Sequence, residues 1–277
     1  MEVLKTDNIY HNEKYSNKNV NELLKEEGKK LVSFLGARQN GTTFLINNIA
    51  RLLAEQDVDV AILDMTKNKS EYYIYTQNKE ALKLKLKDCY KNLSNGIDCG
   101  LSVDNNLTIY TNLPNENEDE YKVERILEML LKKHQIVIID TDFSTDINYF
   151  MFSQQIYLVQ TMDLLTIQSF TEFLSELKSQ NAINNEKIRI ILNKYIELDG
   201  ISVKQLIGSL AFYNEPVLAY MQKLFETNGI KYTTIPYSQQ IYEMYLQTIA
   251  KSQIFLERYP IEFRTKLEGL SRDVMNG

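Results

Sequence analysis

The chain has 277 residues, with 31 basic and 37 acidic side chains and a formal net charge of −6. This acidic balance argues against a protein that coats nucleic acid through bulk charge. No run of about 18 apolar residues occurs and the start is polar, so we expect no secretory signal, no transmembrane segment and a cytoplasmic protein.

In chain order, residues 1–29 are rich in Asn, Lys and Glu and predict an extension with at most one short helix near Val20 to Glu27. From Lys30 onward, apolar runs of strand length alternate with longer helical patterns, which is typical of βαβ units. The predicted strands are Leu31–Leu35, Val58–Leu63, Leu107–Tyr110, Gln135–Ile139, Ile156–Gln160, Ile188–Leu192 and Ile230–Ile235. The predicted helices are Thr42–Gln56, Tyr121–Lys133, Leu164–Gln180, Ile201–Leu210, Pro216–Thr227, Gln239–Lys251 and Ile261–Val274.

The strands are nearly continuous in apolar residues, as in VAILD and IVIID, which indicates burial on both faces. The predicted fold class is therefore α/β, a three-layer arrangement with a mostly parallel central sheet and helices on both faces. Only 10 glycines and 4 prolines interrupt the chain, so long irregular linkers are not expected. Residues 30–277 are predicted to form a single domain with C-terminal helices.

The first predicted strand leads through residues 36–43 (GARQNGTT) straight into a helix. A P-loop, G-x-x-x-x-G-K-[ST], has this position because backbone N–H groups of the turn and the helix N-terminus cradle phosphate oxygens. Gly36, Gly41 and Thr43 fit the pattern, and Thr42 stands where the lysine belongs. Taken alone, the stretch also fits an ordinary strand-to-helix turn with two glycines.

Four segments, of which the first contains this loop, occur in an order that resembles the MinD/ParA family of P-loop ATPases, whose deviant Walker A motif reads K-G-G-x-G-K-[ST]-T. The segments are the loop, helix and second strand ending at Asp64, the strand IVIIDTDFS at Ile136–Ser144, IILNKY at Ile190–Tyr195, and TTIPYS at Thr233–Ser238. The resemblance spans about Lys30 to Lys251. It implies a P-loop NTPase fold of MinD/ParA type, ATP or ADP with Mg²⁺ as cofactors, and a homodimer.

The resemblance also assigns roles to individual residues. Thr43 and Asp140 would hold Mg²⁺ together with Asp64 at the end of the second strand, while Gly36, Arg38, Gly41 and Thr42 would surround the phosphates. Asn193 and Pro236 would contact adenine. Each has a structural alternative, since Thr43 can cap a helix, Asp140 can cap the following turn, and Asn and Pro are common turn residues.

Departures from the family pattern concern hydrolysis. The lysine that reaches across the family's dimer is replaced by Ala37, and the second lysine by Thr42. Thr66 stands where the family has the second aspartate of D-x-D, which positions the attacking water. Arg38 and Gln39 replace the middle glycines of the family's loop, and their side chains hinder close backbone approach to the phosphates. We therefore expect a pseudo-ATPase unless Arg38 replaces a lysine, because arginine can bind phosphate bidentately.

Two surface features bear on partners. Lys83, Lys85, Lys87 and Lys91 form the densest basic stretch, which fits a local DNA contact or, as the favoured interpretation, a solvated helix or edge strand. The last helix has an apolar stripe at Phe263, Leu267, Leu270 and Val274. Its charges are balanced, so packing on the core is preferred to membrane binding.

The remaining candidate chemistry is limited. His11 lies in the polar extension and His134 at a helix end, so a histidine triad or metal centre is not expected. Cys89 and Cys99 lack zinc-ligand partners nearby and are predicted to be a reduced thiol pair.

Three functions remain open. The first is a dimeric scaffold or positioning factor with a degenerate nucleotide site, with the TadZ/CpaE-like proteins of pilus assembly as the nearest analogue. It would serve a larger pilus, secretion, conjugation or cell-pole assembly, with recruitment to a membrane-associated complex. The second is an active ParA-type partitioning ATPase that uses Arg38. The third is an interaction module that binds no nucleotide.

Overall fold

The computed structural model describes residues 19–76, 79–114, 121–163, 166–200, 202–203, 207 and 231–277. The helices predicted at Ile201–Leu210 and Pro216–Thr227 lie outside this part of the chain, apart from residues 202–203 and 207.

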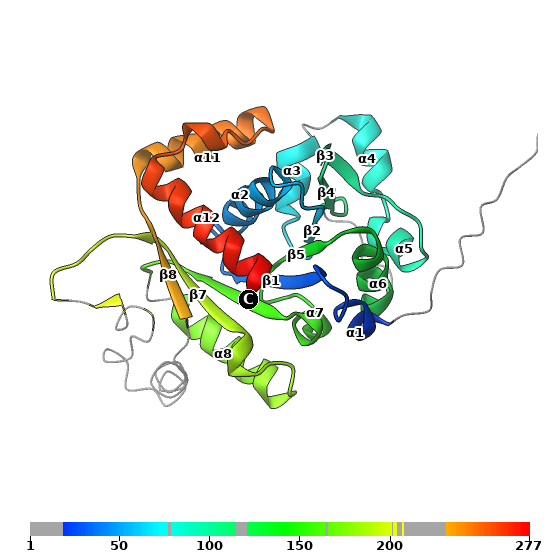
Figure 1. Cartoon of the computed structure of the whole chain (residues 1–277), viewed down its shortest axis with the longest axis horizontal. Helices are drawn as coiled ribbons and strands as arrows, with labels where there is room; N and C mark the ends of the chain where they lie inside the picture. The colour runs from blue at the N-terminus through cyan, green and yellow to red at the C-terminus, as the bar shows by residue number, and fades with distance from the viewer. Residues whose placement is uncertain are drawn as a thin grey trace, which may run out of the picture.

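A sheet of eight strands in the order β3-β4-β2-β5-β1-β6-β7-β8 runs through the middle of the described molecule (Figure 1). Only the edge pair of β3 and β4 is antiparallel, and the other neighbours are parallel. The strands are β1 Lys30–Gly36, β2 Val60–Asp64, β3 Leu101–Asp104, β4 Leu107–Tyr110, β5 Ile136–Thr141, β6 Gln155–Gln160, β7 Ile188–Tyr195 and β8 Lys231–Pro236.

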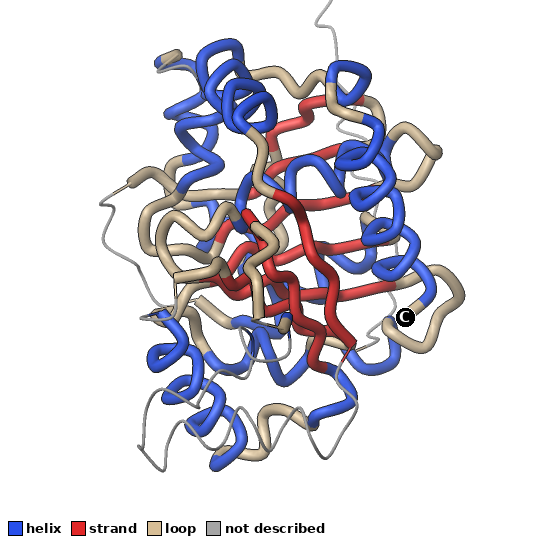
Figure 2. Tube along the Cα trace, turned by 90° about the vertical axis from the view of Figure 1, so that its left-hand side faces the viewer, coloured by secondary structure: helices blue, strands red, loops and turns tan. Residues whose placement is uncertain are grey.

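Helices cover both faces of the sheet, so the structure has three layers (Figure 2). One face is covered by α2 Thr42–Ala54, α3 Ser70–Thr76, α11 Gln239–Lys251 and α12 Ile261–Asn276. The other face is covered by α1 Val20–Leu23, α5 Cys89–Ser94, α6 Val123–Lys133, α7 Ile147–Phe152 and α8 Ile167–Ser179. Helix α4 Glu80–Leu86 lies beyond the β3–β4 edge.

Alternation along the strands explains the two-sided core. In β1, Val32 and Phe34 face the cluster under α2 and α12, while Leu31 and Leu35 face the opposite helices. A strand that is buried on both faces is apolar at nearly every position, which is why these strands appear in the sequence as nearly continuous apolar runs. The buried Ser33 of β1 is an exception, and its hydroxyl is hydrogen-bonded to that of Ser153 at 2.6 Å. The α/β fold class is confirmed.

All seven predicted strands are present, within a few residues of their expected ends. The prediction missed β3 and the short helices α3, α4, α5 and α7. The C-terminal helix packs on the core, as the sequence predicted, because Phe263, Leu267, Leu270 and Val274 are buried against α2 and the sheet.

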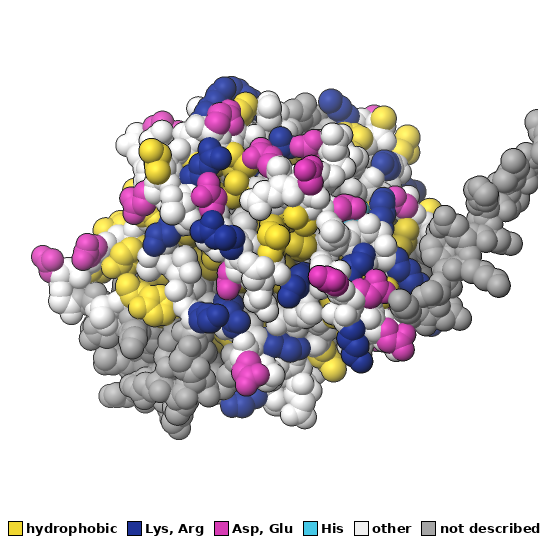
Figure 3. Space-filling view, in the orientation of Figure 1, with side chains coloured by type: hydrophobic (Ala, Val, Ile, Leu, Met, Phe, Trp, Pro, Cys, Tyr) yellow, Lys and Arg dark blue, Asp and Glu magenta, His cyan; other side chains and the backbone are white. Residues whose placement is uncertain are grey.

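On the face that carries α11 and α12, basic and acidic side chains are interspersed (Figure 3).

The sequence predicted the first short helix correctly and the state of the two cysteines wrongly. The short helix near Val20 is α1, whose Val20 and Leu23 are buried in the core beside α6. The thiol prediction is wrong, because Cys89 and Cys99 form a disulfide, and both side chains are buried. Packing of α5 against the end of the loop that precedes β3 brings the two sulfurs together across ten positions of sequence.

Candidate functional site

The loop between β1 and α2 ends in a helix start that has no capping side chain. Gly41 is the N-cap residue, with φ of 81°, and no side chain there accepts a hydrogen bond from the first turn. Only glycine adopts this backbone conformation readily. Because the first N–H groups of α2 have no capping acceptor, this helix start is a suitable place for an anion.

The side chain at the lysine position, that of Thr42, lies against the first glycine of the loop. A Cβ atom added at Gly36 would lie 1.7 Å from the Thr42 hydroxyl oxygen, so Thr42 packs back against the first glycine of the loop. Thr42 is buried, and its hydroxyl has no hydrogen-bond partner among the described residues. Gly36 is therefore required by the close approach of Thr42.

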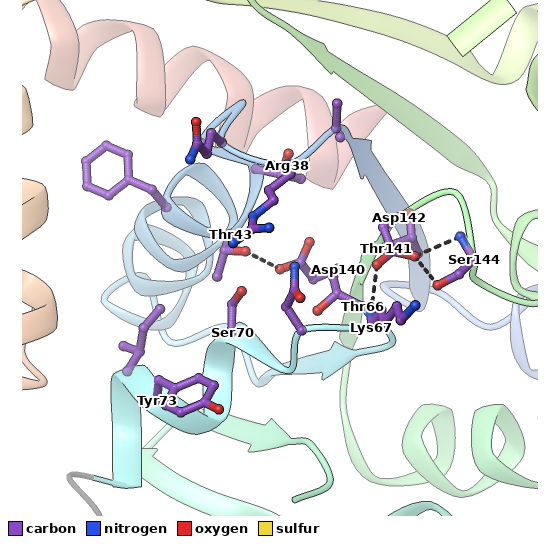
Figure 4. Close-up of a pocket in the computed structure, with 18 of the residues that line it drawn as sticks. Arg38, Thr43, Thr66, Lys67, Ser70, Tyr73, Asp140, Thr141, Asp142 and Ser144 are labelled. Atoms are coloured by element: carbon purple, nitrogen blue, oxygen red, sulfur yellow. Dashed lines mark hydrogen bonds between the residues drawn. The ribbon is translucent and has the colours of Figure 1, made fainter. Parts of the chain in front are cut away.

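The next residue reaches the neighbouring strand. The Thr43 hydroxyl donates a hydrogen bond of 2.6 Å to Oδ2 of Asp140, at the end of β5 (Figure 4). The other carboxylate oxygen of Asp140 is buried without a partner in the described part of the chain. Burial, and next the charge of Asp64, raise the pKa of Asp140 well above its ordinary value. A cation placed beside this oxygen would offset that cost.

Asp64 occupies the matching position on β2, directly beside Asp140 in the strand register. Its Oδ1 accepts hydrogen bonds from the backbone N–H and hydroxyl of Thr66, at 3.0 and 2.6 Å. Its Oδ2 accepts from the backbone N–H of Glu71 at 3.0 Å and from the Thr111 hydroxyl at 3.3 Å. Asp64 does not line the cavity described next, so Thr43 and Asp140 are the better placed pair for a metal.

A cavity of about 810 Å³ opens at the carboxyl ends of β1, β5 and β2. Gly36, Gly41, Thr42, Thr43 and Asp140 line it, together with Arg38, which extends from the loop toward Thr43 (Figure 4). The loop, helix start and aspartate predicted for the phosphates and the metal are thus brought to one place. Among the described residues no group of three or more His, Cys, Asp or Glu side chains could hold a metal alone. Magnesium in such a site takes its other ligands from phosphate and water.

A second cavity of about 370 Å³ adjoins the first and shares Gln39, Gly41, Phe44 and Tyr245 with it. Asn193 and Pro236, the residues predicted to contact adenine, both line this second cavity at the ends of β7 and β8. The Asn193 amide donates a hydrogen bond of 2.7 Å to the backbone carbonyl of Asn40. Further lining is aromatic and comes from Tyr237, Tyr242 and Tyr245, which suits a flat ring system.

Sequence reasoning missed Lys67 and Asp142, which also line the larger cavity. The backbone N–H of Lys67 donates to Oδ2 of Asp142 at 2.7 Å, and Oδ1 of Asp142 accepts from the backbone N–H and hydroxyl of Ser144 (Figure 4). Ligands of open α/β sheets bind at the carboxyl ends of strands, so the position of Lys67 just after a predicted strand was the available signal.

The lysines considered for DNA lie away from this cavity. Lys83 and Lys85 are on α4, Lys87 directly follows it, and Lys91 is on α5. Lys83 forms an ion pair of 3.2 Å with Glu80 on the same helix. None of the described helices is long and apolar enough to cross a bilayer.

No family model matches the sequence, and no curated protein does. Solved structures do match. A ParA family ATPase from Chlorobium tepidum has a TM-score of 0.60 at 16% identity, covering 88% of this chain and 99% of its own. A Borrelia burgdorferi protein bound to AMPPNP and described as a plasmid partition protein gives 0.61 at 16%, covering 89% and 98%. The MinC:MinD complex of Aquifex aeolicus gives 0.59 at 11%, covering 89% and 96%.

The chain has the MinD/ParA fold. Similarity therefore extends beyond the short motifs to the order and placement of the whole sheet. Within the MinD/ParA fold, the cavity at the ends of β1, β5 and β2 is formed by the loop and strand ends that the sequence motifs marked.

Proposed function

We propose that this chain binds a Mg²⁺ nucleotide of the ATP or ADP type and hydrolyses it slowly or not at all. The main support is the hydrogen bond between Thr43 and Asp140. Both residues line the larger cavity, which adjoins the cavity around Asn193 and Pro236. Magnesium would be held by Thr43 and Asp140, and phosphates by the first N–H groups of α2. The metal would neutralise phosphate charge when bound.

Slow hydrolysis is supported by the two threonines that replace charged groups. Thr42 lies against Gly36 and brings no cation to the phosphates. Thr66 donates its hydroxyl hydrogen to Asp64, and no carboxylate stands at its position to orient a water. Loss of a transition-state cation costs on the order of 10³- to 10⁵-fold in rate, whereas loss of one lysine–phosphate contact weakens binding by about 10- to 150-fold. Binding therefore persists more readily than turnover.

A static nucleotide site fits a protein that uses nucleotide to hold a conformation or a dimer. We accordingly propose a homodimeric scaffold or positioning factor for a larger assembly, in which the partner is a protein. Support comes from the fold neighbour in which MinD is assembled with MinC. An assembly of that kind could be recruited to a membrane without a membrane span of its own.

Binding is tested by isothermal titration of the purified chain with AMPPNP and with ADP, each with Mg²⁺. We expect saturable binding that weakens when Mg²⁺ is chelated. Replacement of the threonine at the lysine position, Thr42→Lys, is expected to raise affinity by about 10- to 150-fold because it adds a charge-assisted contact. Thr42→Ser is the matched control and should leave affinity unchanged. Absence of binding by the wild type and by Thr42→Lys would instead support a module that binds no nucleotide.

A second candidate is an active ParA-type ATPase, favoured by the position of Arg38 in the cavity. Phosphate release that disappears in Arg38→Ala would support it. Salt-sensitive DNA binding that is lost when Lys83, Lys85, Lys87 and Lys91 are changed to glutamate would support a partitioning role. We expect neither result, because the proposed site lacks both lysines of the family motif.

A further inference from the structure

The larger cavity contains two cationic side chains that come from different elements. Arg38 belongs to the loop after β1, and Lys67 to the segment after β2. No ion pair joins either side chain to another residue in the part of the chain that the structure describes. Basic side chains elsewhere do have acidic partners, as Arg51 has Asp104 and Lys133 has Asp98. The two cations are therefore available to an anionic ligand.

Strand order fixes which part of a nucleotide each cation can meet. From one edge inward, the sheet runs β8, β7, β6, β1, β5, β2. The cavity with Asn193 and Pro236 lies at the β7–β8 end, the helix start for phosphates follows β1, and Asp140 ends β5. A nucleotide with its base at β7–β8 and its inner phosphates at α2 would point its last phosphate toward the ends of β5 and β2. Among the described residues that line the cavity, Lys67 is the cationic side chain on that side.

The backbone of Lys67 is held while its side chain is exposed. Its N–H is bonded to Asp142, and the Thr145 hydroxyl donates to the backbone carbonyl of Met65 at 3.2 Å. These two bonds join the segment after β2 to the segment after β5, and Figure 4 shows the first of them. A lysine anchored in this way has a flexible four-carbon stem with a compact charge at its tip, which suits a single phosphate group.

We propose that Lys67 binds the terminal phosphate of a nucleoside triphosphate and makes this site prefer triphosphate to diphosphate. Lys67 thus supplies from the end of β2 the cation that Thr42 does not supply from the loop. Arg38, which extends toward Thr43 and the start of α2, meets the inner phosphates that both nucleotides share. This inference rests on the proposed nucleotide site.

The test is titration of the full chain with AMPPNP and with ADP, each with Mg²⁺. In Lys67→Ala and Lys67→Gln we expect AMPPNP affinity to fall by about 10-fold or more, with ADP affinity within about twofold of wild type. Lys67→Arg should retain most of the preference because it keeps the charge. Arg38→Ala should weaken both nucleotides, and Lys85→Ala, on the exposed face of α4, should weaken neither.

Outcomes separate this inference from the function on which it rests. If the wild type binds AMPPNP but both Lys67 variants lower AMPPNP and ADP affinity equally, or lower neither, Lys67 has no role at the terminal phosphate and the nucleotide site still stands. If the wild type binds neither nucleotide, the nucleotide site and this inference both fail. The backbone bond to Asp142 survives all three Lys67 substitutions, so thermal unfolding of the unliganded variants should match that of the wild type.

Discussion

Two aspartates lie side by side at the ends of neighbouring strands but differ in the hydrogen bonds that their carboxylates accept. Asp64 and Asp140 are register partners on β2 and β5, and both are buried. Both oxygens of Asp64 accept hydrogen bonds from the segment that follows it or from Thr111. The Asp140 carboxylate accepts one hydrogen bond, from the Thr43 hydroxyl, and its other oxygen has no partner among the described residues.

This difference separates a structural carboxylate from one that is available for a ligand. Asp64 uses its acceptors to fold the chain after β2 back toward α3, and it does not line the cavity. Asp140 lines the cavity and keeps an acceptor free, and its burial raises its pKa because the charged form is disfavoured. Residue type and strand position are the same in the two cases, so the hydrogen-bond partners decide which aspartate could serve a metal.

Removal of the Asp64 carboxylate should lower stability far more than removal of the Asp140 carboxylate, and this difference is the largest effect we predict. Asp64→Ala leaves several buried donors without an acceptor and is expected to lower the free energy of unfolding by about 3–5 kcal/mol. Asp140→Asn keeps the acceptor for Thr43 and replaces a carboxyl whose charged form is disfavoured by burial, so stability should change by less than about 1 kcal/mol. Urea denaturation monitored by circular dichroism measures both values.

Nucleotide titration completes the same experiment. Asp140→Asn should lose most of the Mg²⁺ dependence of nucleotide affinity, because the metal loses its carboxylate. Equal destabilisation by the two substitutions, or an unchanged Mg²⁺ dependence in Asp140→Asn, would show that the two aspartates do not differ as their hydrogen bonds indicate.

The disulfide lies next to a residue that contacts Asp64, and its removal is expected to cause the next largest loss of stability. Tyr90, beside Cys89, donates its hydroxyl to the backbone carbonyl of Asp64. Closing a loop of about ten residues restricts the unfolded chain, so Cys89→Ala with Cys99→Ala should lower the free energy of unfolding by about 2–3 kcal/mol. Affinity for Mg²⁺ nucleotide should stay the same, because Asp140 has no contact with this bridge.

Alkylation of the denatured, unreduced protein checks the bridge itself. Mass spectrometry should find no modified cysteine before reduction and two after it. Modification of both cysteines without reductant would contradict the bridge, and a stability loss shared equally by Cys89→Ala and the double variant would agree with it.

Much of the fold could be predicted because parallel strands buried on both faces are apolar at nearly every position. This pattern located β1, β2, β5, β6 and β7. It failed for β3, whose residues are half-buried or exposed, and for α3, α4, α5 and α7, which are only six or seven residues long. Helices this short carry too few turns for a periodic signal and depend on tertiary packing.

The candidate site was predictable in its residues and less so in their surroundings. The places of Thr43 and Asp140 in two motifs predicted that they belong to one site, and the structure brings them within hydrogen-bond distance, while their role toward a metal stays a prediction. Neither the contact of Thr42 with Gly36 nor the hydrogen bonds that surround Asp64 follows from a motif, because both depend on how the loops after the strands fold back. The disulfide was missed for a similar reason, since only the fold places α5 beside Cys99.

The smallest effect we predict is a change in the pH dependence of stability when Glu71 is replaced. Glu71 is influenced by the charges of Asp64 and Asp140. It is buried, its Oε1 accepts from Asn47 at 2.7 Å, and its Oε2 has no partner among the described residues. Burial first, and the charges of Asp64 and Asp140 next, raise the pKa of Glu71 well above its ordinary value of 4.5. The folded chain therefore retains a proton that the unfolded chain releases, so this group's contribution to stability is present at low pH and lost as pH rises through the folded-state pKa.

Glu71→Gln removes that titration while keeping the acceptor for Asn47. At pH 5 the free energy of unfolding of the variant should lie close to that of the wild type. By pH 8 the variant should be more stable by about 1 kcal/mol or more, since each unit of pKa difference corresponds to about 1.4 kcal/mol. Urea denaturation at pH 5, 6, 7 and 8 measures the difference in free energy of unfolding between the variant and the wild type. The other titrating groups are the same in both proteins, so their contributions cancel in this difference. A constant difference over this range would mean that Glu71 is already ionised in the folded protein and that the charges of Asp64 and Asp140 do not act on it.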